Sequence, residues 1–398
     1  MTSALIVGGG PAGAALATLL AGAGREVTVL ERGRQAADKV CGEFISVECA
    51  EYLRGLGLDL DALGAVRLGR LRVSAGDLVA ETALPFAALS LSRRVLDEAL
   101  LQRAAAAGAE VRRGAKVTAL EAIDGRQRAR LDDGSNVEAG AAFLATGKHD
   151  LRGWARGAGQ QDDLVAFKLH WELGEAEARA LAGHVELHLF ADGYAGLQPI
   201  EGGRANLCLV VRKARFAALG HRWESLLPWM RERAPLLGQR LGGARACWER
   251  PLSLSRIPYG LVQHRADGVW RLGDQAAVIP SFSGDGMAIA LHSAHLAART
   301  WLDGGDAETY QRALAAHVRR QLRLATPLSR AVVQVWLQRP FVRAARRWPT
   351  LLRWVARATR VPASVLEPNR GAAGVSDRGA QSLQTGAGLS GARQRATP

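Results

Sequence analysis

The N-terminal segment carries the pattern that most constrains the fold of this chain. An apolar run at 4–7 is followed by the sequence Gly8-Gly9-Gly10-Pro11-Ala12-Gly13 and by an Ala/Leu-rich stretch that reaches Ala23. A second run of β-branched and apolar residues, 26–30, comes next. A buried strand, a glycine-rich turn, a helix and a second strand in this order make a βαβ unit. The chain is therefore expected to begin with a Rossmann-like α/β domain.

Each part of this motif has a physical role in binding a dinucleotide. Gly8 allows the tight turn, Gly10 lets the backbone approach a pyrophosphate, and Gly13 lets the helix pack closely on the strand. The N-terminus of the helix offers free N–H groups and a partial positive charge to phosphates. Glu31 ends the second strand, where it can accept hydrogen bonds from a ribose hydroxyl. The predicted cofactor contacts in this region are Gly8, Gly10, Pro11, Ala12, Gly13, Glu31 and Arg32.

A second match to the same glycine spacing, 386–391, has no strand before it and no helix after it. It lies in the segment 367–398, which is rich in Gly, Ala, Ser and Gln and has no hydrophobic periodicity. We therefore expect 367–398 to be a disordered tail without a cofactor site.

Composition and charge limit the class of protein. The chain has 398 residues, 48% of them hydrophobic, and no apolar run approaches the length of a membrane-spanning helix. Its four cysteines show no metal-type spacing, and the N-terminus enters a strand without a secretory signal, so we expect a reduced, cytoplasmic enzyme. Residues 311–398 contain 16 Arg and two acidic residues, which accounts for the whole net charge of +14. No nucleic-acid partner is expected.

The order of the patterns predicts a discontinuous first domain. A helix is expected over 91–107, short strands near 110–111, 116–122, 126–131, 137–139 and 142–145, a returning strand at 269–272 and a helix at 287–301. Between them, the β-branched or alternating runs 166–173, 185–190 and 207–211 predict an antiparallel sheet, with helices over 215–241. The expected boundaries are 1–160 with 258–305 for the first domain, 161–257 for a second, α+β substrate domain, and 306–366 for a helical extension.

A second glycine-rich segment appears late in the chain, where Gly273-Asp274 is followed by Pro280 and by Gly284-Asp285-Gly286-Met287. With both segments in this order, residues 2–302 resemble the flavoprotein superfamily of p-hydroxybenzoate hydroxylase, which also holds geranylgeranyl reductases and flavin-dependent halogenases. The resemblance implies a two-domain flavoprotein fold of the GR2 type that binds FAD. It further implies that Arg93, Val117, Gly273, Asp274, Gly284, Gly286 and Met287 contact the cofactor.

Three stretches depart from the patterns of that superfamily. Its middle motif, Gly-Ala-Asp-Gly, reads Ala-Thr-Gly-Lys-His-Asp at 145–150, although the resemblance still implies NAD(P)H as electron donor. Residues 194–199 resemble the Tyr-x-Trp-x-Phe-Pro stretch of the reductases, but Gly196 and Gln198 replace the aromatics. The Trp-x-Trp-x-x-Pro motif of the halogenases is missing, which argues against halogenation. Cys41-Gly42 falls where the reductases carry a Cys-Gly pair near the flavin.

The resemblance leaves the reaction open between two main hypotheses. The first is NAD(P)H-driven monooxygenation of a hydrophobic aromatic or polyketide-like molecule, in which the protein positions the substrate and excludes water. The alternative is saturation of prenyl double bonds, as in the geranylgeranyl reductases. A hypothesis of a different class is a non-catalytic, membrane-associated flavin-binding protein. The candidate catalytic residues are Cys41, Tyr194 and Gln198, although for Cys41 we favour the interpretation as a small residue packed in a tight loop.

Several polar residues recur at alternate positions of the expected strands: His170, Glu172, His184, Glu186 and His188. Such spacing could supply metal ligands, but flavin chemistry needs no metal. We interpret these residues, and Lys148-His149, as solvated polar positions of strands and loops, and predict no metal site.

The C-terminal extension combines aromatic and basic residues. Trp336, Phe341, Trp348 and Trp354 alternate with arginines at three- and four-residue spacing. This pattern is typical of a helix that lies on an anionic membrane surface. Packing of the apolar side on the first domain, or docking of an acidic carrier protein, explains the pattern equally well.

Overall fold

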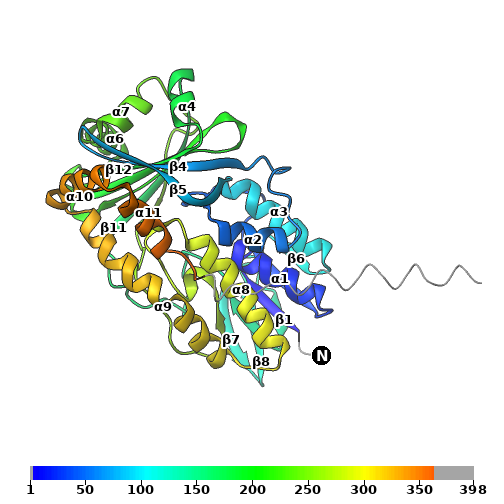
Figure 1. Ribbon diagram of the computed structural model, residues 1–398. Helices are drawn as coiled ribbons and strands as arrows, with labels where there is room; N and C mark the ends of the chain where they lie inside the picture. The colour runs from blue at the N-terminus through cyan, green and yellow to red at the C-terminus, as the bar shows by residue number, and fades with distance from the viewer. Residues whose placement is uncertain (1–2, 363–398) are drawn as a thin grey trace, which may run out of the picture. The chain divides into compact units, whose positions relative to one another are not determined.

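A parallel five-stranded sheet organises the N-terminal part of the computed structural model, which describes residues 3–362 (Figure 1). Its strands run in the order β17-β10-β1-β2-β6. They are β1 (Ala4–Val7), β2 (Val27–Glu31), β6 (Glu110–Arg113), β10 (Ala141–Leu144) and β17 (Trp270–Arg271). Each pair in this sheet is parallel, as the βαβ pattern predicts. Two chain segments distant in sequence therefore share one sheet.

Helices pack on this sheet and carry the glycine segments. They include α1 (Pro11–Gly22), α2 (Val47–Gly55), α3 (Arg93–Ala106), α8 (Gly286–Leu302) and α9 (Ala307–Val332). Helix α1 contacts both α3 and α8, and its buried residues join those of α8 in one hydrophobic core. A separate three-stranded sheet lies after β6, formed by β7 (Val117–Ile123), β8 (Arg126–Leu131) and β9 (Asn136–Ala139). No described helix is both long enough and apolar enough to cross a bilayer.

The second large sheet has nine strands, in the order β15-β11-β14-β13-β12-β4-β5-β3 with β16 beside β11. Its strands are β3 (Phe44–Ile45), β4 (Val66–Ala75), β5 (Leu78–Ser90), β11 (Leu164–Glu172), β12 (His184–Phe190), β13 (Gly193–Pro199), β14 (Ala205–Arg212), β15 (Arg245–Ala246) and β16 (Leu252–Leu254). The boundaries expected from the sequence assigned 44–90 to the first domain, whereas β3, β4 and β5 belong to this sheet. The reason is non-local, because β4 pairs in parallel with β12, more than a hundred residues later.

The two faces of this sheet are covered by different helices, as β14 shows. Leu207, Leu209 and Val211 point to one face, where they pack with α6 (Trp223–Arg233) and α7 (Pro235–Arg240). Val210, on the alternate face, packs with residues of α10 (Val335–Arg347) and α11 (Pro349–Ala358). Two shorter helices, α4 (Glu175–Leu181) and α5 (Lys213–Ala218), complete the described part. The expected tail at 367–398, with the match at 386–391, lies outside the described residues.

Candidate functional site

Three glycines of the first motif have distinct surroundings. Gly8 has a φ of 109°, and a Cβ there would lie 2.4 Å from the carbonyl oxygen of Ala145. A Cβ on Gly13 would lie 1.9 Å from the carbonyl oxygen of Gly8. A Cβ on Gly10, in contrast, would meet only the guanidinium of Arg93, at 3.5 Å. Gly8 and Gly13 therefore serve backbone packing, whereas Gly10 borders open space.

The N-terminus of α1 faces the same space. Gly10 is the N-cap and makes no side-chain capping bond, Pro11 is the first helical residue, and no acidic residue lies in the first turn. The helix dipole and the uncapped N–H groups therefore make this end attractive to an anion. Arg93 adds a positive charge, and two hydrogen bonds of 2.7 and 2.8 Å to Asp97 fix its guanidinium. This arrangement fits the pyrophosphate of a dinucleotide.

Other residues of the predicted cofactor site have the following positions. The carboxylate of Glu31 accepts hydrogen bonds of 2.8 Å from the N–H groups of both Gly9 and Gly33, which holds it at the end of β2 beside the glycine turn. Arg32 is exposed. Val117 begins β7, an edge strand whose register with β8 shifts at this point. The proposed contacts of these residues with the cofactor remain predictions.

The two glycine segments, distant in sequence, meet in the structure. A Cβ on Gly273 would lie 3.4 Å from the Cβ of Ala12 in α1. The N–H of Gly273 donates a 2.9 Å hydrogen bond to Ser293 of α8, and the half-buried Asp274 follows it. Helix α8 begins at Gly286, where a Cβ would meet nothing within 4 Å, and the next residue, Met287, is buried. Both segments thus border one region between the N-termini of α1 and α8.

Two tyrosines anchor the loop before α8. The hydroxyl groups of Tyr194 and Tyr259 lie 2.9 and 2.6 Å from Oγ of Ser281, and the N–H of Phe282 donates to the Tyr194 hydroxyl at 3.2 Å. Burial raises the pKa of both phenols, that of Tyr259 to about 12. Tyr194, a catalytic candidate in the sequence, is therefore a neutral residue that fixes the backbone of this loop.

Asp285, beside Gly284 and Gly286, forms a buried ion pair that the sequence analysis missed. Its carboxylate lies 3.2 Å from Nη1 of Arg360 and accepts a 2.8 Å hydrogen bond from the N–H of Val361. The guanidinium of Arg360 also donates to the carbonyl of Ser283 and lies over two aromatic rings. Burial raises the pKa of Asp285 to about 6, although the charge of Arg360 opposes this. No local pattern separates Arg360 from the other C-terminal arginines.

A second buried network surrounds Glu43. Its carboxylate accepts hydrogen bonds from Lys168 and from the N–H of Arg93 (2.8 Å), and it lies 2.8 Å from Nε2 of His170. Burial alone would raise the pKa of Glu43, but His170 and Lys168 together lower it below its usual range. Asp38, Glu43 and His170 have ligand atoms within 4.8 Å of one another, yet the Lys168 ammonium already supplies the positive charge that a metal ion would bring.

The interpretation of the alternating polar residues as solvated positions was wrong for three of them. His170, Glu186 and His188 are all buried. Glu186 pairs with Arg240 at 3.0 Å and also with Arg72, and these partners come from α7 and β4. The alternation in the sequence indicates which residues share a face of a strand. It does not indicate which cationic side chains of other elements are buried beside them.

The loop at 38–43 is tied to the second sheet. The amide of Asn206 donates to the carbonyls of Cys41 (3.1 Å) and Gly42 (2.9 Å), and Nζ of Lys148 donates to the carbonyl of Val40 at 2.6 Å. Lys148 is therefore not the solvated loop residue that we expected. Sγ of Cys41 accepts from the N–H of Glu43 at 3.4 Å, which supports its role in a tight loop. Gly42 faces open space at the edge of a cavity.

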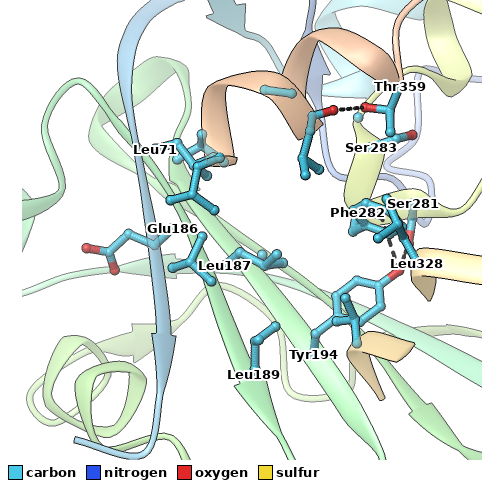
Figure 2. A pocket seen from close by; sticks show the side chains of 18 of the residues that line it. Leu71, Glu186, Leu187, Leu189, Tyr194, Ser281, Phe282, Ser283, Leu328 and Thr359 are labelled. Atoms are coloured by element: carbon cyan, nitrogen blue, oxygen red, sulfur yellow. Dashed lines mark hydrogen bonds between the residues drawn. The ribbon is translucent and has the colours of Figure 1, made fainter. Parts of the chain in front are cut away.

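This cavity has a volume of about 350 Å³ and lies beside the loop before α8 (Figure 2). One end borders the loop that precedes α8 and has polar groups from Gly42, Gln198, Cys208 and Ser281. Gln338, Thr359 and Arg360 also line the cavity. Gln198, the third catalytic candidate, is buried and bonded to Ser90 at 2.6 Å. Figure 2 shows Leu187 and Leu189 on the strand side of the cavity, with the Glu186 carboxylate pointing away. The remaining walls are mainly aliphatic and aromatic: Leu71, Val73, Leu84, Phe86, Val185, Leu328, Val332, Leu337, Phe341, Leu352 and Val355.

The different surroundings of Gly10 and Gly13 generate a paired prediction. Gly10→Val adds a side chain to the open cradle, so the protein should fold but lose the visible absorbance of bound flavin. Gly13→Val drives a side chain into the backbone of Gly8, so the βαβ unit should fail to form. Circular dichroism and absorbance of the purified variants measure the two outcomes. A Gly10→Val protein that keeps its flavin would contradict the assignment of the cradle.

The raised pKa of Asp285 predicts a pH-dependent stability. Its folded pKa, about 6, lies above its usual value of 3.8, so the folded state binds the proton more tightly. The tighter binding of the proton adds on the order of 3 kcal/mol to the free energy of unfolding. This stabilisation is present at low pH and is lost as the pH rises through 6. Asp285→Asn cannot ionise, so its stability relative to wild type should increase between pH 4 and pH 6. Denaturant titrations at several pH values test this, and parallel curves would refute it.

Comparison with known proteins finds a family model and relatives that match parts of the chain. Residues 1–145 match the family model described as an FAD binding domain. A menaquinone reductase of Mycolicibacterium smegmatis is 27% identical over 321 residues, 76% of each chain, and a digeranylgeranylglycerophospholipid reductase of Methanopyrus kandleri is 30% identical over 52% of this chain and 54% of its own.

Solved structures agree on the fold. The flavin-dependent brominase Bmp2 superposes with a TM-score of 0.75 at 19% identity, covering 90% of this chain and 93% of its own. The halogenase PltM, in a complex with phloroglucinol and FAD, gives a TM-score of 0.70 at 18% identity, with coverage of 89% and 85%. The glycine cradle, the two helix N-termini and these matches together make the chain similar to FAD-dependent oxidoreductases of the p-hydroxybenzoate hydroxylase-like superfamily.

Proposed function

We propose that this protein is an FAD-dependent reductase that saturates a carbon–carbon double bond in the isoprenoid chain of a lipid. The observation that carries this proposal is the cavity beside the loop before α8, whose lining is mainly aliphatic and aromatic. A prenyl chain has no hydrogen-bonding groups, so aliphatic walls accommodate it without leaving polar atoms unpaired. A polar aromatic substrate would need partners that these walls do not offer.

The relatives support the same class of substrate. They are named as reductases of menaquinone and of digeranylgeranylglycerophospholipid, and both molecules carry isoprenoid chains. The halogenases among the solved structures are similar in fold at 18–19% identity, and this similarity carries no argument about the reaction. Monooxygenation, the first hypothesis from the sequence, remains the second candidate, and the use of oxygen separates the two.

The reaction adds two hydrogens to the double bond. FAD held at the glycine cradle would, once reduced, supply a hydride equivalent for one carbon, and the other carbon would take up a proton. We retain reduced nicotinamide as the proposed source of the electrons. The residues of the chain orient the substrate and exclude water. Tyr194 and Tyr259 fix the loop at Ser281, and Cys208 lies at the polar end of the cavity, where burial raises its pKa to about 12 and keeps the thiol protonated.

An anaerobic assay tests the proposed reaction. The protein is reduced with dithionite, which removes any dependence on the natural electron donor, and is mixed with geranylgeranyl lipid or menaquinone. We expect the product mass to rise by two hydrogens for each bond saturated. A substrate that remains unchanged without oxygen and gains one atom from labelled O₂ would instead establish monooxygenation.

A residue in the cavity wall provides a second prediction. Ala356 of α11 lines the cavity, so Ala356→Trp should fill it and lower prenyl reduction at least tenfold, while flavin absorbance and its reduction by dithionite remain unchanged. Ala217→Trp, on the exposed side of α5, is the matched control. Equal activity of both variants would show that the substrate binds elsewhere.

A further inference from the structure

The large exposed hydrophobic side chains of residues 3–362 are concentrated in one segment. They are Val335 (58% exposed), Trp336 (69%), Trp348 (59%) and Trp354 (56%), and all belong to α10, α11 or the residue that joins them. Exposed tryptophans that gather in one place mark an interaction surface more strongly than scattered ones. We call this surface, over 335–358, the Trp/Arg face.

Arginines are interspersed with these tryptophans. Six are exposed on the same two helices: Arg339, Arg343, Arg346, Arg347, Arg353 and Arg357. No acidic residue occurs between 335 and 358. Arg339 pairs with Asp77, whereas the other five make no ion pair with any described residue. Among the described residues the face is therefore strongly positive, and Asp77 compensates the charge of Arg339 alone by an ion pair.

The helical spacing places the residues of the Trp/Arg face on one side of each helix and the residues that line the cavity on the other side. Trp336, Arg343 and Arg347 follow one another at intervals of seven and four residues, which places them along one side of α10. The opposite sides of α10 and α11 include Phe341 and Leu352, which line the cavity. Both helices pack on β5, as their positions in Figure 1 also indicate. One pair of helices thus covers the cavity from outside and presents tryptophan and arginine outward.

We infer that the Trp/Arg face docks on the surface of an anionic lipid bilayer. Tryptophan is enriched at the level of lipid headgroups because its ring is amphipathic, and arginine is attracted to anionic headgroups. A bilayer surface offers an interfacial position to the tryptophans and anionic headgroups to the arginines along the whole Trp/Arg face. The position of the face over an apolar cavity also favours a lipid environment over an acidic protein. The inference concerns the surface alone and does not depend on which reaction the cavity supports.

Flotation of the full-length FAD-bound protein with vesicles tests the inference. Vesicles of equal parts phosphatidylglycerol and phosphatidylcholine should carry the protein upward, and vesicles of phosphatidylcholine alone should carry much less. Raising the salt from about 0.1 M to about 1 M shortens the Debye length from about 10 Å to about 3 Å and should release part of the bound protein.

Matched variants assign the binding to the face. Arg346→Gln with Arg347→Gln should weaken the partition into anionic vesicles about 25-fold, since each arginine near the surface contributes about a fivefold factor. Arg250→Gln with Arg265→Gln, exposed residues outside the face, makes the same change of charge and should have no comparable effect. Trp348→Ser with Trp354→Ser should weaken the binding that remains at high salt. Flavin absorbance and circular dichroism confirm that each variant is folded.

Two results would overturn the inference. One is recovery of wild-type protein in the unbound fraction with both kinds of vesicle. The other is binding that the two pairs of substitutions in the Trp/Arg face do not reduce, which would locate the contact elsewhere in the chain. Light scattering in the absence of vesicles identifies a second copy of the chain as the occupant, if wild type is dimeric and the Trp348→Ser, Trp354→Ser variant is monomeric.

Discussion

The buried carboxylate of Glu43 is the interaction on which the rest of the site depends. It binds Lys168 and His170 of β11 and the backbone N–H of Arg93 at the start of α3, so one side chain joins the second sheet to the helix that borders the phosphate cradle. Glu43 has a φ of 59°, an unfavourable conformation for a residue other than glycine. Removing one partner of such a buried pair typically costs about 3–5 kcal/mol. The geometry at 38–43 is therefore maintained by these contacts rather than by local preference.

Around this junction the protein combines two different environments. The cradle beside Gly10 and Arg93 is positive and suits phosphates, whereas the cavity beyond Gly42 is almost entirely apolar. The loop at 281–285 lies where these environments meet, held by Tyr194 and Tyr259 on one side and by Arg360 on the other. A charged cofactor and a hydrophobic substrate can therefore approach one another although they need opposite surroundings.

The sequence predicted those parts of the site whose signal is local. Gly8 in the turn at 8–13 and Gly284 in the segment at 284–287 have φ values of 109° and 70°, a local backbone conformation that favours glycine. The strands β1 and β2, which flank the first of these segments, have regular apolar patterns. The placement of β4 and β5 was not predictable in this way, because their partner β12 lies far along the chain. The burial of Glu186 was not predictable for the same reason, because its ion-pair partners Arg72 and Arg240 belong to β4 and α7. Tertiary contacts, not local preference, determine these features.

The contact between Arg360 and the loop before α8 gives the C-terminal segment a second role besides covering the cavity. Shortening the chain before this residue would remove more than a covering for the cavity, because Asp285 would lose the cation beside it and the N–H of Val361. Both contacts lower the pKa of Asp285, so without them the buried carboxyl group would bind its proton more tightly. Arg360 and Val361 therefore influence the protonation of a carboxyl group in the loop before α8, although they lie far from it along the chain.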